Sequence, residues 1–216
     1  MKIMAVSDQV LDNIYNPHIR QKYPDIDLII GCGDLPYYYL EFLNSALDAP
    51  LLYVLGNHDR GPQYTVDGRE LRSVQGGVNL HARAVQEQKI LFAGLEGSMR
   101  YRPKASLMYT EAEMQREVLK LMPMLLWNRA RYGRYLDILV THSPPKDIHD
   151  RDDLAHRGFA VFRRLLGFAR PQLMIHGHIH LYQQGIQESV FEGTRIMNVY
   201  PLYVFEFELF GAMGGD

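Results

Sequence analysis

Five hydrophobic stretches of the chain end abruptly on polar residues of types that bind metal ions. Each stretch is short and nearly free of other polar residues, which is typical of strands buried on both faces of a parallel sheet. In open α/β sheets, ligands bind in the crevice outside the carboxyl ends of the strands. We therefore predict that the residues closing these stretches face one crevice. The stretches are residues 3–8, 28–34, 51–59, 138–142 and 173–180.

The segments between the first three stretches have the length and apolar spacing of helices. Asp8, Asp34 and Asn57 recur 26 and then 23 residues apart, close to the roughly 30 residues of a βαβ unit. Apolar residues at helical spacing predict helices over 11–19 and 38–47. Alternation of strands and helices predicts an α/β fold built on a parallel sheet.

Two more helices are expected in the second half of the chain. Thr110 and Glu113 have the spacing of a capping box, and the helix that they open should extend to about Arg131. Pro123 is expected to kink that helix. A further helix should begin at residue 153 or 156 and end near residue 168.

The remaining segments are predicted to be strands and two long loops. Strands are expected near 78–85 and 89–93, and then over 135–141 and 172–175. Residues 60–77 and 94–109 are rich in glycine, proline and polar residues, and irregular loops of this length are usually functional. We expect these two loops to determine specificity.

After residue 181, apolar and polar residues alternate in a pattern that predicts a β-meander. Strands are predicted over 185–191, 194–198 and 202–209, with a hairpin turn at Glu192–Gly193. In the last strand, apolar residues alternate with glutamates, which predicts one buried face. The apolar residues are Tyr203, Phe205, Phe207 and Leu209.

Composition favours a single soluble domain over residues 1–216, with a frayed tail at about 211–216. The net charge of −2 provides no basic field of the kind typical of nucleic-acid-binding proteins. The single cysteine, Cys32, precludes an intramolecular disulfide and fits a packing role. No apolar stretch reaches the roughly 18–20 residues of a membrane span, and no signal peptide precedes Ile3. We expect a cytoplasmic protein.

The polar residues that close the five stretches are hard oxygen donors and imidazoles. Such a mixture suits Mn, Fe or Zn rather than a metal held by thiolates. The pair His178 and His180 is especially informative, because two imidazoles two residues apart cost core stability unless they bind something. The candidate ligand-type residues are Asp8, Asp34, Asn57, His58, His142, His178 and His180.

Taken in order, these blocks resemble the calcineurin-like metallophosphoesterase family. The family pattern is D-x-H, GD, GNH[DE], a lone His and GHxH, and the resemblance extends from residue 3 to residue 180. It implies a four-layer αββα sandwich, in which two mixed β-sheets pack face to face between outer helices. It also implies a metal-dependent phosphoesterase that uses two divalent ions and direct attack of a metal-bound hydroxide on phosphorus.

The resemblance also implies a role for each residue of the site. Asp8 and His180 would hold the first metal, and Asp34 would bridge both. The second metal would be held by Asn57, His142 and His178. His58 would be the catalytic histidine that protonates the leaving oxygen or stabilises phosphoryl charge, with Asp59 orienting its ring. A carboxylate in that place would fix the ring tautomer and raise its basicity.

The first block departs from the family pattern. It reads Asp8-Gln9-Val10, and a valine cannot coordinate a metal. Only Asp8, Asp34 and His180 would then hold the first ion, and three protein ligands suffice for an open catalytic site. We expect a weak or more hydrated first site, and a mononuclear enzyme that uses the second site alone is the alternative.

Other residues could contact substrate. Arg60 and Arg100 could attract an anion, together with Arg102 and Lys104. Tyr37 could stack on an aromatic group. His149 and His156 could reach the mouth of the crevice, but solvated loop positions are the favoured interpretation. His176 is predicted to be a core histidine, and His18 and His81 to be surface residues.

The leading functional hypothesis is hydrolysis of a small phosphomonoester or phosphodiester. Fold resemblance does not identify the substrate. The first alternative is a nuclease or RNA-processing diesterase, which the slightly acidic balance disfavours. The second is a non-catalytic binding protein with a degraded first metal site. Retention of His58 and Asp59 argues against it, because a binding protein needs no general acid. Oligomeric state and pathway are left open.

Overall fold

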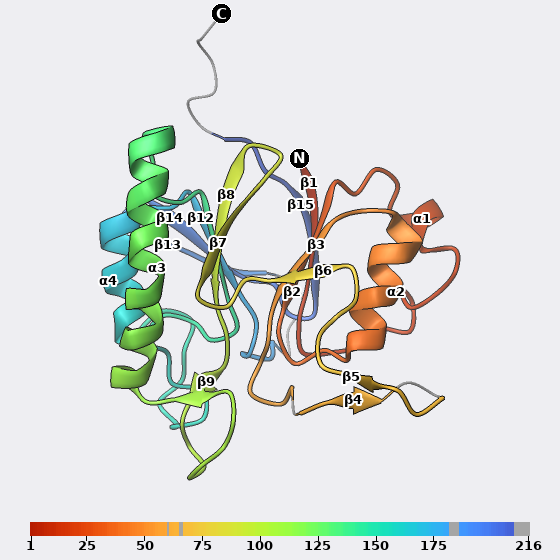
Figure 1. Cartoon of the computed structure of the whole chain (residues 1–216), viewed down its shortest axis with the longest axis horizontal. Coiled ribbons are helices and arrows are strands. Elements are labelled where there is room, and N and C mark those ends of the chain that lie inside the picture. The colour runs from red at the N-terminus through yellow and green to blue at the C-terminus, as the bar shows by residue number, and fades with distance from the viewer. Residues whose placement is uncertain (60, 65–66, 182–185, 210–216) are drawn as a thin grey trace, which may run out of the picture.

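Two β-sheets pack face to face, and each is covered on its outer face by helices (Figure 1). The computed structural model describes residues 1–59, 61–64, 67–181 and 186–209. The α/β sandwich of two mixed sheets that the resemblance implied is confirmed. Among the described helices, none is long and apolar enough to cross a lipid bilayer.

The first sheet contains the strands of three of the five hydrophobic stretches. Its order is β15–β1–β2–β3–β6, and all its strands run parallel except β15, which pairs antiparallel with β1. The strands are β1 (Lys2–Val6), β2 (Leu28–Cys32), β3 (Leu51–Val54), β6 (Gly77–Asn79) and β15 (Leu202–Glu206).

The second sheet contains the other two. Its order is β13–β14–β12–β11–β8–β7, with four parallel central strands and an antiparallel strand at each edge. The strands are β7 (Arg83–Glu87), β8 (Ile90–Leu95), β11 (Ile138–Thr141), β12 (Leu173–His176), β13 (Gln187–Phe191) and β14 (Thr194–Asn198).

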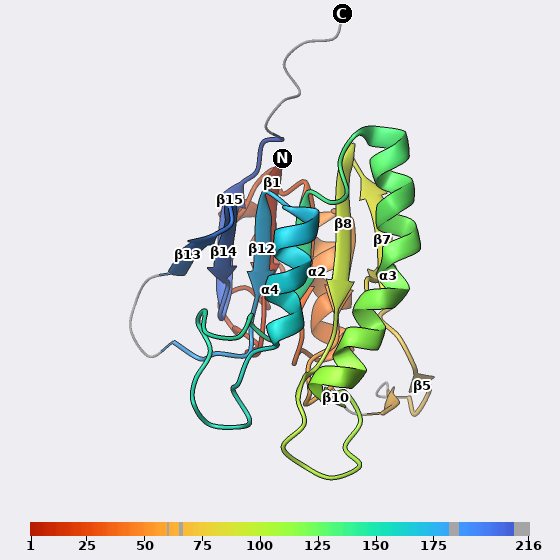
Figure 2. The same cartoon turned by 90° about the vertical axis from the view of Figure 1, so that its left-hand side faces the viewer.

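Helices complete the four layers. Those on the first sheet are α1 (Ile19–Lys22) and α2 (Tyr37–Leu47), and those on the second are α3 (Glu111–Tyr132) and α4 (Ala160–Ala169). Figure 2 shows α3 and α4 side by side over the second sheet. Apolar side chains fill the space between the sheets and the space under each helix pair.

The long helix α3 follows its sequence signals closely. Thr110 accepts a hydrogen bond from the backbone N–H of Glu113, whose side chain accepts one from the Thr110 N–H, so the capping box is confirmed. The helix continues through Pro123 and ends at Gly133, which adopts a left-handed φ of 75°. Glycine tolerates that conformation without the steric cost of a Cβ.

The helix predicted over 11–19 is wrong. The chain there forms turns, and the regular helix α1 begins only at Ile19. The reason lies in Asn16 and Pro17: the residue before a proline is disfavoured in helical conformation, and the Asn16 side chain accepts a hydrogen bond from the His18 N–H. Ile14 is still fully buried. The apolar spacing therefore marked burial rather than a helix.

The strand predicted near 78–85 is two strands that lie in different sheets. β6 ends at Asn79 in the first sheet, and β7 begins at Arg83 in the second. Between them, Asn79 accepts a hydrogen bond from the His81 N–H, and Ala82 adopts a left-handed φ of 50°. This turn carries the chain from one sheet to the other.

The predicted meander is correct only in its hairpin. β13 and β14 pair antiparallel around Glu192 and Gly193, which both have positive φ, as a two-residue hairpin turn requires. The last strand, β15, crosses instead to the first sheet and pairs with β1. Tyr203, Phe205, Phe207 and Leu209 pack in the core between the sheets, as predicted for that face, whereas Leu202 and Val204 pack against the cluster under α2. The predicted tail at 211–216 lies outside the described residues.

The two long loops contain short strand pairs. Within 60–77, β4 (Gln63–Tyr64) pairs antiparallel with β5 (Glu70–Leu71). Within 94–109, β9 (Ser98–Met99) pairs parallel with β10 (Met108–Tyr109). Figure 1 shows both loops extending from the same end of the sandwich, which is also the end where β1 to β3 terminate.

Candidate metal centre

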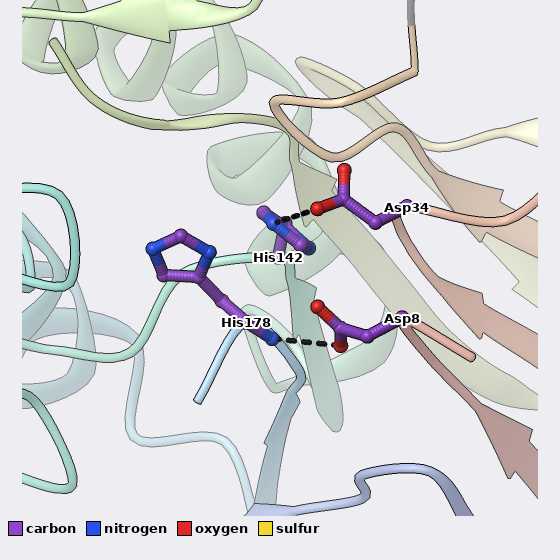
Figure 3. Close-up of side chains that lie close together, drawn as sticks. All are labelled: Asp8, Asp34, His142 and His178. Carbon is purple, nitrogen blue, oxygen red and sulfur yellow. Dashed lines mark hydrogen bonds and ion pairs between the residues drawn. The ribbon is translucent and has the colours of Figure 1, made fainter. Parts of the chain in front are cut away.

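The carboxyl ends of strands from both sheets meet at one edge of the sandwich. Asp8 and Asp34 follow β1 and β2 of the first sheet, whereas His142 and His178 follow β11 and β12 of the second. Figure 3 shows these four side chains pointing toward one another. One ligand atom from each lies within 4.8 Å of the others. The prediction that the ends of the hydrophobic stretches face one crevice is therefore confirmed for these four residues.

The backbone at this edge turns sharply to aim the side chains inward. Asp8, Asp34 and His178 all have positive φ, at 62°, 56° and 66°. Such values are uncommon for residues with a Cβ and are typical of functional sites. Gly177 allows a close approach, since a Cβ there would lie 2.5 Å from Asp8 Oδ2. Gly56 is equally constrained, because a Cβ would overlap Asp34 Oδ1.

The His142 ring is fully buried, and a backbone carbonyl group fixes its orientation from the side away from the centre. Its Nδ1 lies 2.8 Å from the Cys32 carbonyl oxygen, to which it can only donate. That bond leaves Nε2 facing the centre, 3.1 Å from Asn57 Oδ1 and 3.5 Å from Asp34 Oδ2. A backbone carbonyl behind the ring is how proteins commonly fix the tautomer of a metal-binding histidine.

His178 is fixed in the same manner through its other nitrogen. Its Nε2 lies 2.8 Å from the Ala155 carbonyl oxygen, which leaves Nδ1 as the free ligand atom. Its backbone N–H donates to Asp8 Oδ2 at 2.9 Å. Burial and the neighbouring His142 charge lower the pKa of His178 to about 3. The ring is therefore neutral at physiological pH, which is the form that binds metals.

Asn57 completes this side of the centre. It is buried, and its amide nitrogen donates to the Tyr101 hydroxyl at 3.4 Å. With the nitrogen held there, the amide oxygen faces His142 Nε2. We call Asn57, His142 and His178 the buried half of the centre.

Asp8 and His180 form the other side, which we call the open half. His180 Nε2 lies 3.5 Å from Asp8 Oδ1, and its side chain is 48% exposed. Its ring stacks on Tyr200 at 4.5 Å, and the Tyr200 hydroxyl donates to Gln9 Oε1. Hydrogen bonding and the Asp8 charge raise the pKa of His180.

The two carboxylates require a compensating positive charge. Burial tends to raise the pKa of Asp34, but the charge and hydrogen bond of His142 outweigh it and lower that pKa to about 2. Burial tends to lower the pKa of His142, and the Asp34 and Asp8 charges outweigh it and raise that pKa to about 9. A pair of ionised carboxylates in a buried crevice is thus compensated by a proton on His142, a place that a cation could take.

The residues present fit divalent metal ions. Asp8 Oδ1 is buried and, among the described residues, its one polar contact is the long ion pair of 3.5 Å with His180 Nε2. A buried carboxylate oxygen with so weak a partner is costly unless something else binds it. Two carboxylates, an amide oxygen and imidazoles, once a metal replaces the proton on His142, are also a ligand set for Mn, Fe or Zn. The cluster agrees with the divalent metals that the sequence resemblance implies, and neither identifies the metal.

His58 and Asp59 lie beside the cluster. His58 is exposed, and its backbone N–H donates to Asp34 Oδ1 at 2.7 Å. The Asp59 carboxylate was expected to orient the His58 ring. It instead accepts hydrogen bonds from the backbone N–H groups of Asp34, at 2.8 Å, and of Gly56, at 2.7 Å. Asp59 therefore fixes the backbone that carries the candidate bridging residue.

Position 10 does not contribute to the cluster. Val10 is half-buried and packs against the apolar cluster under α2. The family pattern has a histidine at this position, near the first metal. In this chain the valine at the same position packs against apolar side chains instead.

The further candidates have different surroundings. Tyr37 is 4% exposed and lines a cavity next to Asp59. The His156 ring lies 5.3 Å from the His178 ring and is bonded to Asp153, so it is at the edge of the centre. Arg60 lies outside the described residues.

Two candidates make structural contacts instead. Arg100 bonds to the Met108 carbonyl oxygen and forms an ion pair with Glu113, so the guanidinium is engaged in holding the 94–109 loop. His149 bonds to His176 Nε2 at 2.9 Å and to Ser189 at 2.9 Å.

The expectations for the other histidines have mixed outcomes. His176 is the core histidine predicted, since it is fully buried and also bonds to the Gly177 carbonyl oxygen. His18 is exposed as expected. His81 is not a surface residue, because it is half-buried beside Glu96 and Glu117.

Several supporting groups could not be found from sequence. Tyr101, Tyr200, and the carbonyl groups of Cys32 and Ala155 hold the candidate ligands through contacts between segments far apart in the chain. The one usable signal was the position of Tyr101 within an irregular loop of the kind that often carries functional residues.

Comparisons with known proteins agree with this geometry. Residues 3–182 match the family model for calcineurin-like phosphoesterases. The structure of TT1561 from Thermus thermophilus has a TM-score of 0.58 at 18% identity, over 92% of this chain and 88% of that one. Another solved structure has a TM-score of 0.62 at 13% identity, over 96% and 99% of the two chains. At such identities these two structures support the fold alone.

A search of curated proteins gives no match. The family match indicates metal-dependent hydrolysis of phosphoesters, without a particular substrate or reaction. Because it spans most of the sequence and the candidate ligands fall within it, the assignment is direct: the chain belongs to the calcineurin-like phosphoesterase family.

Proposed function

We propose that this protein hydrolyses a small phosphomonoester or phosphodiester with the help of two divalent ions, Mn, Fe or Zn. The observation that carries the proposal is the cluster of four ligand-type side chains, in which two buried carboxylates lie together and Asp8 Oδ1 has, among the described residues, only the 3.5 Å contact with His180. Two buried carboxylates with so few polar partners are a place where a cation is favoured.

The proposed division of the ligands has a geometric basis. Asp34 lies between the halves, since its Oδ2 is 3.5 Å from His142 Nε2 and it shares the cluster with Asp8. We assign Asp34 to bridge the two ions, the buried half to the second ion and the open half to the first. Ions held in this way would supply an activated water nucleophile and would neutralise charge at the phosphoryl oxygens.

His58 is proposed to protonate the leaving oxygen. Its backbone is tied to Asp34 Oδ1, while its side chain lies at an exposed position. The ring could therefore reach a bound phosphoester, because in this proposal it is not itself bound to a metal ion. Proton transfer by such a group typically contributes about 10²- to 10⁴-fold to a rate.

Metal analysis and activity assays together test this proposal. Purified protein would be loaded with Mn and assayed on p-nitrophenyl phosphate and bis(p-nitrophenyl) phosphate. We expect turnover of at least one of them, and the loss of both turnover and bound metal in Asp34→Asn. Asp12→Asn is the matched control, because Asp12 is exposed and is not one of the clustered residues.

Equal activity in wild type and Asp34→Asn, with any of the three metals, would overturn the enzymatic proposal. Metal binding without turnover would favour the non-catalytic binding protein. The same pair of substrates separates a monoesterase from a diesterase. The RNA-processing alternative is tested by adding single-stranded RNA as a substrate, with the expectation that it is not cleaved.

A further inference from the structure

A cavity of about 600 Å³ lies beside the candidate metal centre. Its walls come from three places: the loop that carries β4 and β5, the end of the β9–β10 loop just before β10, and the segments that follow β2 and β3 of the first sheet. Figure 1 shows both loops at the same end of the sandwich. A volume of this size falls within the roughly 300–1,000 Å³ of small-molecule sites.

The cavity and the metal centre share a wall. Asp59 lines the cavity, and the same carboxylate bonds to the backbone N–H of Asp34. The loop between β9 and β10 touches both places as well. Its Tyr101 bonds to Asn57, and its Ser106 and Leu107 line the cavity. A group bound in the cavity would therefore lie next to a phosphoryl group held at the metals.

The lining is mixed, with an apolar surface and polar groups around it. Tyr37, Leu55, Pro62 and Leu107 provide apolar surface, and Tyr37 adds an aromatic ring. The polar side chains include Ser106 and the Glu70–Arg72 ion pair. The charges of that pair offset each other, so the cavity has no excess of positive charge that would select a second phosphate.

These features suit a planar aromatic group that carries some polar atoms. An aromatic ring packs favourably edge-on or offset against a tyrosine ring. The nearby hydroxyl groups and ion pair can bond to ring substituents. A simple alkyl chain would leave these polar groups unpaired, which costs binding energy.

We propose that this cavity binds the organic part of the substrate, and that this part is a planar aromatic group joined to the phosphate, such as an aryl ring or a nucleobase. The inference rests on the proposed phosphoesterase function. It assigns Ser106 and Leu107 to substrate selection, which the family pattern does not cover, and it gives Tyr37 the role of an aromatic contact.

Filling the cavity tests the assignment. Ser106 is exposed and lines the cavity, so Ser106→Trp should occupy the space without disturbing the core. Ser45→Trp is the matched control, because Ser45 is exposed on α2, has no positive φ and is not part of the lining. Leu107 is left unchanged, since it adopts a left-handed φ of 57°.

The substrates are chosen in pairs that differ only in the group of interest. The diester pair is methyl phenyl phosphate and dimethyl phosphate, and the monoester pair is phenyl phosphate and methyl phosphate, so that only one member of each pair carries an aromatic group. With Mn-loaded wild type, we expect the aromatic member to have a KM lower by about tenfold or more, which corresponds to roughly 1.4 kcal/mol. Ser106→Trp should remove most of that preference, and Ser45→Trp should retain it.

Binding measurements separate the failure of this inference from failure of the proposed function. Calorimetric titration of Mn-loaded protein would compare phenylphosphonate with methylphosphonate. Preference for phenylphosphonate that Ser106→Trp abolishes supports the cavity even if no ester is hydrolysed, and only the enzymatic proposal then fails. Hydrolysis or binding with equal preference for the two members of each pair, or a preference that survives in Ser106→Trp, overturns the cavity assignment.

Discussion

The two halves of the candidate metal centre contain similar ligand types but hold them differently. In the buried half, His142 and His178 each bond through one ring nitrogen to a backbone carbonyl, and Asn57 is oriented by Tyr101. In the open half, the His180 side chain is 48% exposed and its ring rests on Tyr200. The buried half is preorganised by the surrounding structure, whereas the open half depends on a solvent-facing ring.

This difference teaches that a missing ligand is only part of the asymmetry. Val10 removes one histidine from the open half, but the exposure of His180 would weaken that half even with a complete motif. Groups behind a metal ligand typically affect affinity about 10- to 100-fold. We therefore expect two separable affinities, with the tighter ion in the buried half.

The largest expected effect comes from removing one histidine from each half in turn. His142→Ala should weaken the tighter metal-binding step by about 100-fold or more, because it removes a buried, fixed ligand. His180→Ala should weaken the looser step by about tenfold, because the lost ring is already half-exposed. Equilibrium dialysis against Mn, with circular dichroism as a check of folding, measures both. Equal losses in the two variants would break the comparison.

A large effect on turnover alone is expected at His58, which belongs to neither half. His58→Ala should lower kcat by about 100-fold, since it removes the proposed proton donor. Metal content should be unchanged. Steady-state kinetics combined with metal analysis tests this, and loss of metal would mean that His58 is a ligand of one of the halves.

Restoring the family histidine is expected to have a moderate effect. Val10→His should tighten the looser step by about 3- to 10-fold by adding a ligand to the open half. The substitution also removes a half-buried apolar contact, so the free energy of unfolding should fall by about 1 kcal/mol. Mn titration and urea unfolding measure the two quantities. An unchanged looser step would show that position 10 does not reach the first metal.

The smallest expected effect concerns the support of the buried half. Tyr101→Phe removes the hydroxyl that accepts a hydrogen bond from the Asn57 amide and should weaken the tighter step by about threefold, in line with a net hydrogen bond worth roughly 1 kcal/mol or less. Tyr38→Phe is the control, because Tyr38 is 50% exposed on α2 and its ring packs edge-on against Tyr15. A change in the looser step instead would place Asn57 in the open half.

Much of the fold could be predicted because its strands are buried on both faces. Such strands produce uninterrupted apolar runs, and all five predicted runs contain strands of the two sheets. Prediction failed where local signals compete. Residues 11–19 have helical spacing but contain the Asn16–Pro17 turn, and residues 78–85 read as one strand although the turn after Asn79 divides them between two sheets.

The candidate site could likewise be predicted in part from the sequence. The residue types at the strand ends identified Asp8, Asp34, His142 and His178, because a sheet brings the carboxyl ends of its parallel strands to one edge. Contacts between distant segments were not predictable. The Asp59 carboxylate bonds to the Asp34 and Gly56 backbone rather than to the neighbouring His58 ring, and His149 bonds to His176 rather than lining the crevice.

By itself, the sequence determined which residues could bind metal and in which order they occur, since hydrophobic runs ending on Asp, Asn and His specify strands with ligand-type ends. It also determined that position 10 cannot supply a ligand. Only the tertiary structure decided which side chains are buried, which ring nitrogen of each histidine is free, and which loops enclose the cavity beside Asp59. The physical reason is that orientation, burial and enclosure depend on groups far away along the chain, and folding alone brings those groups into contact.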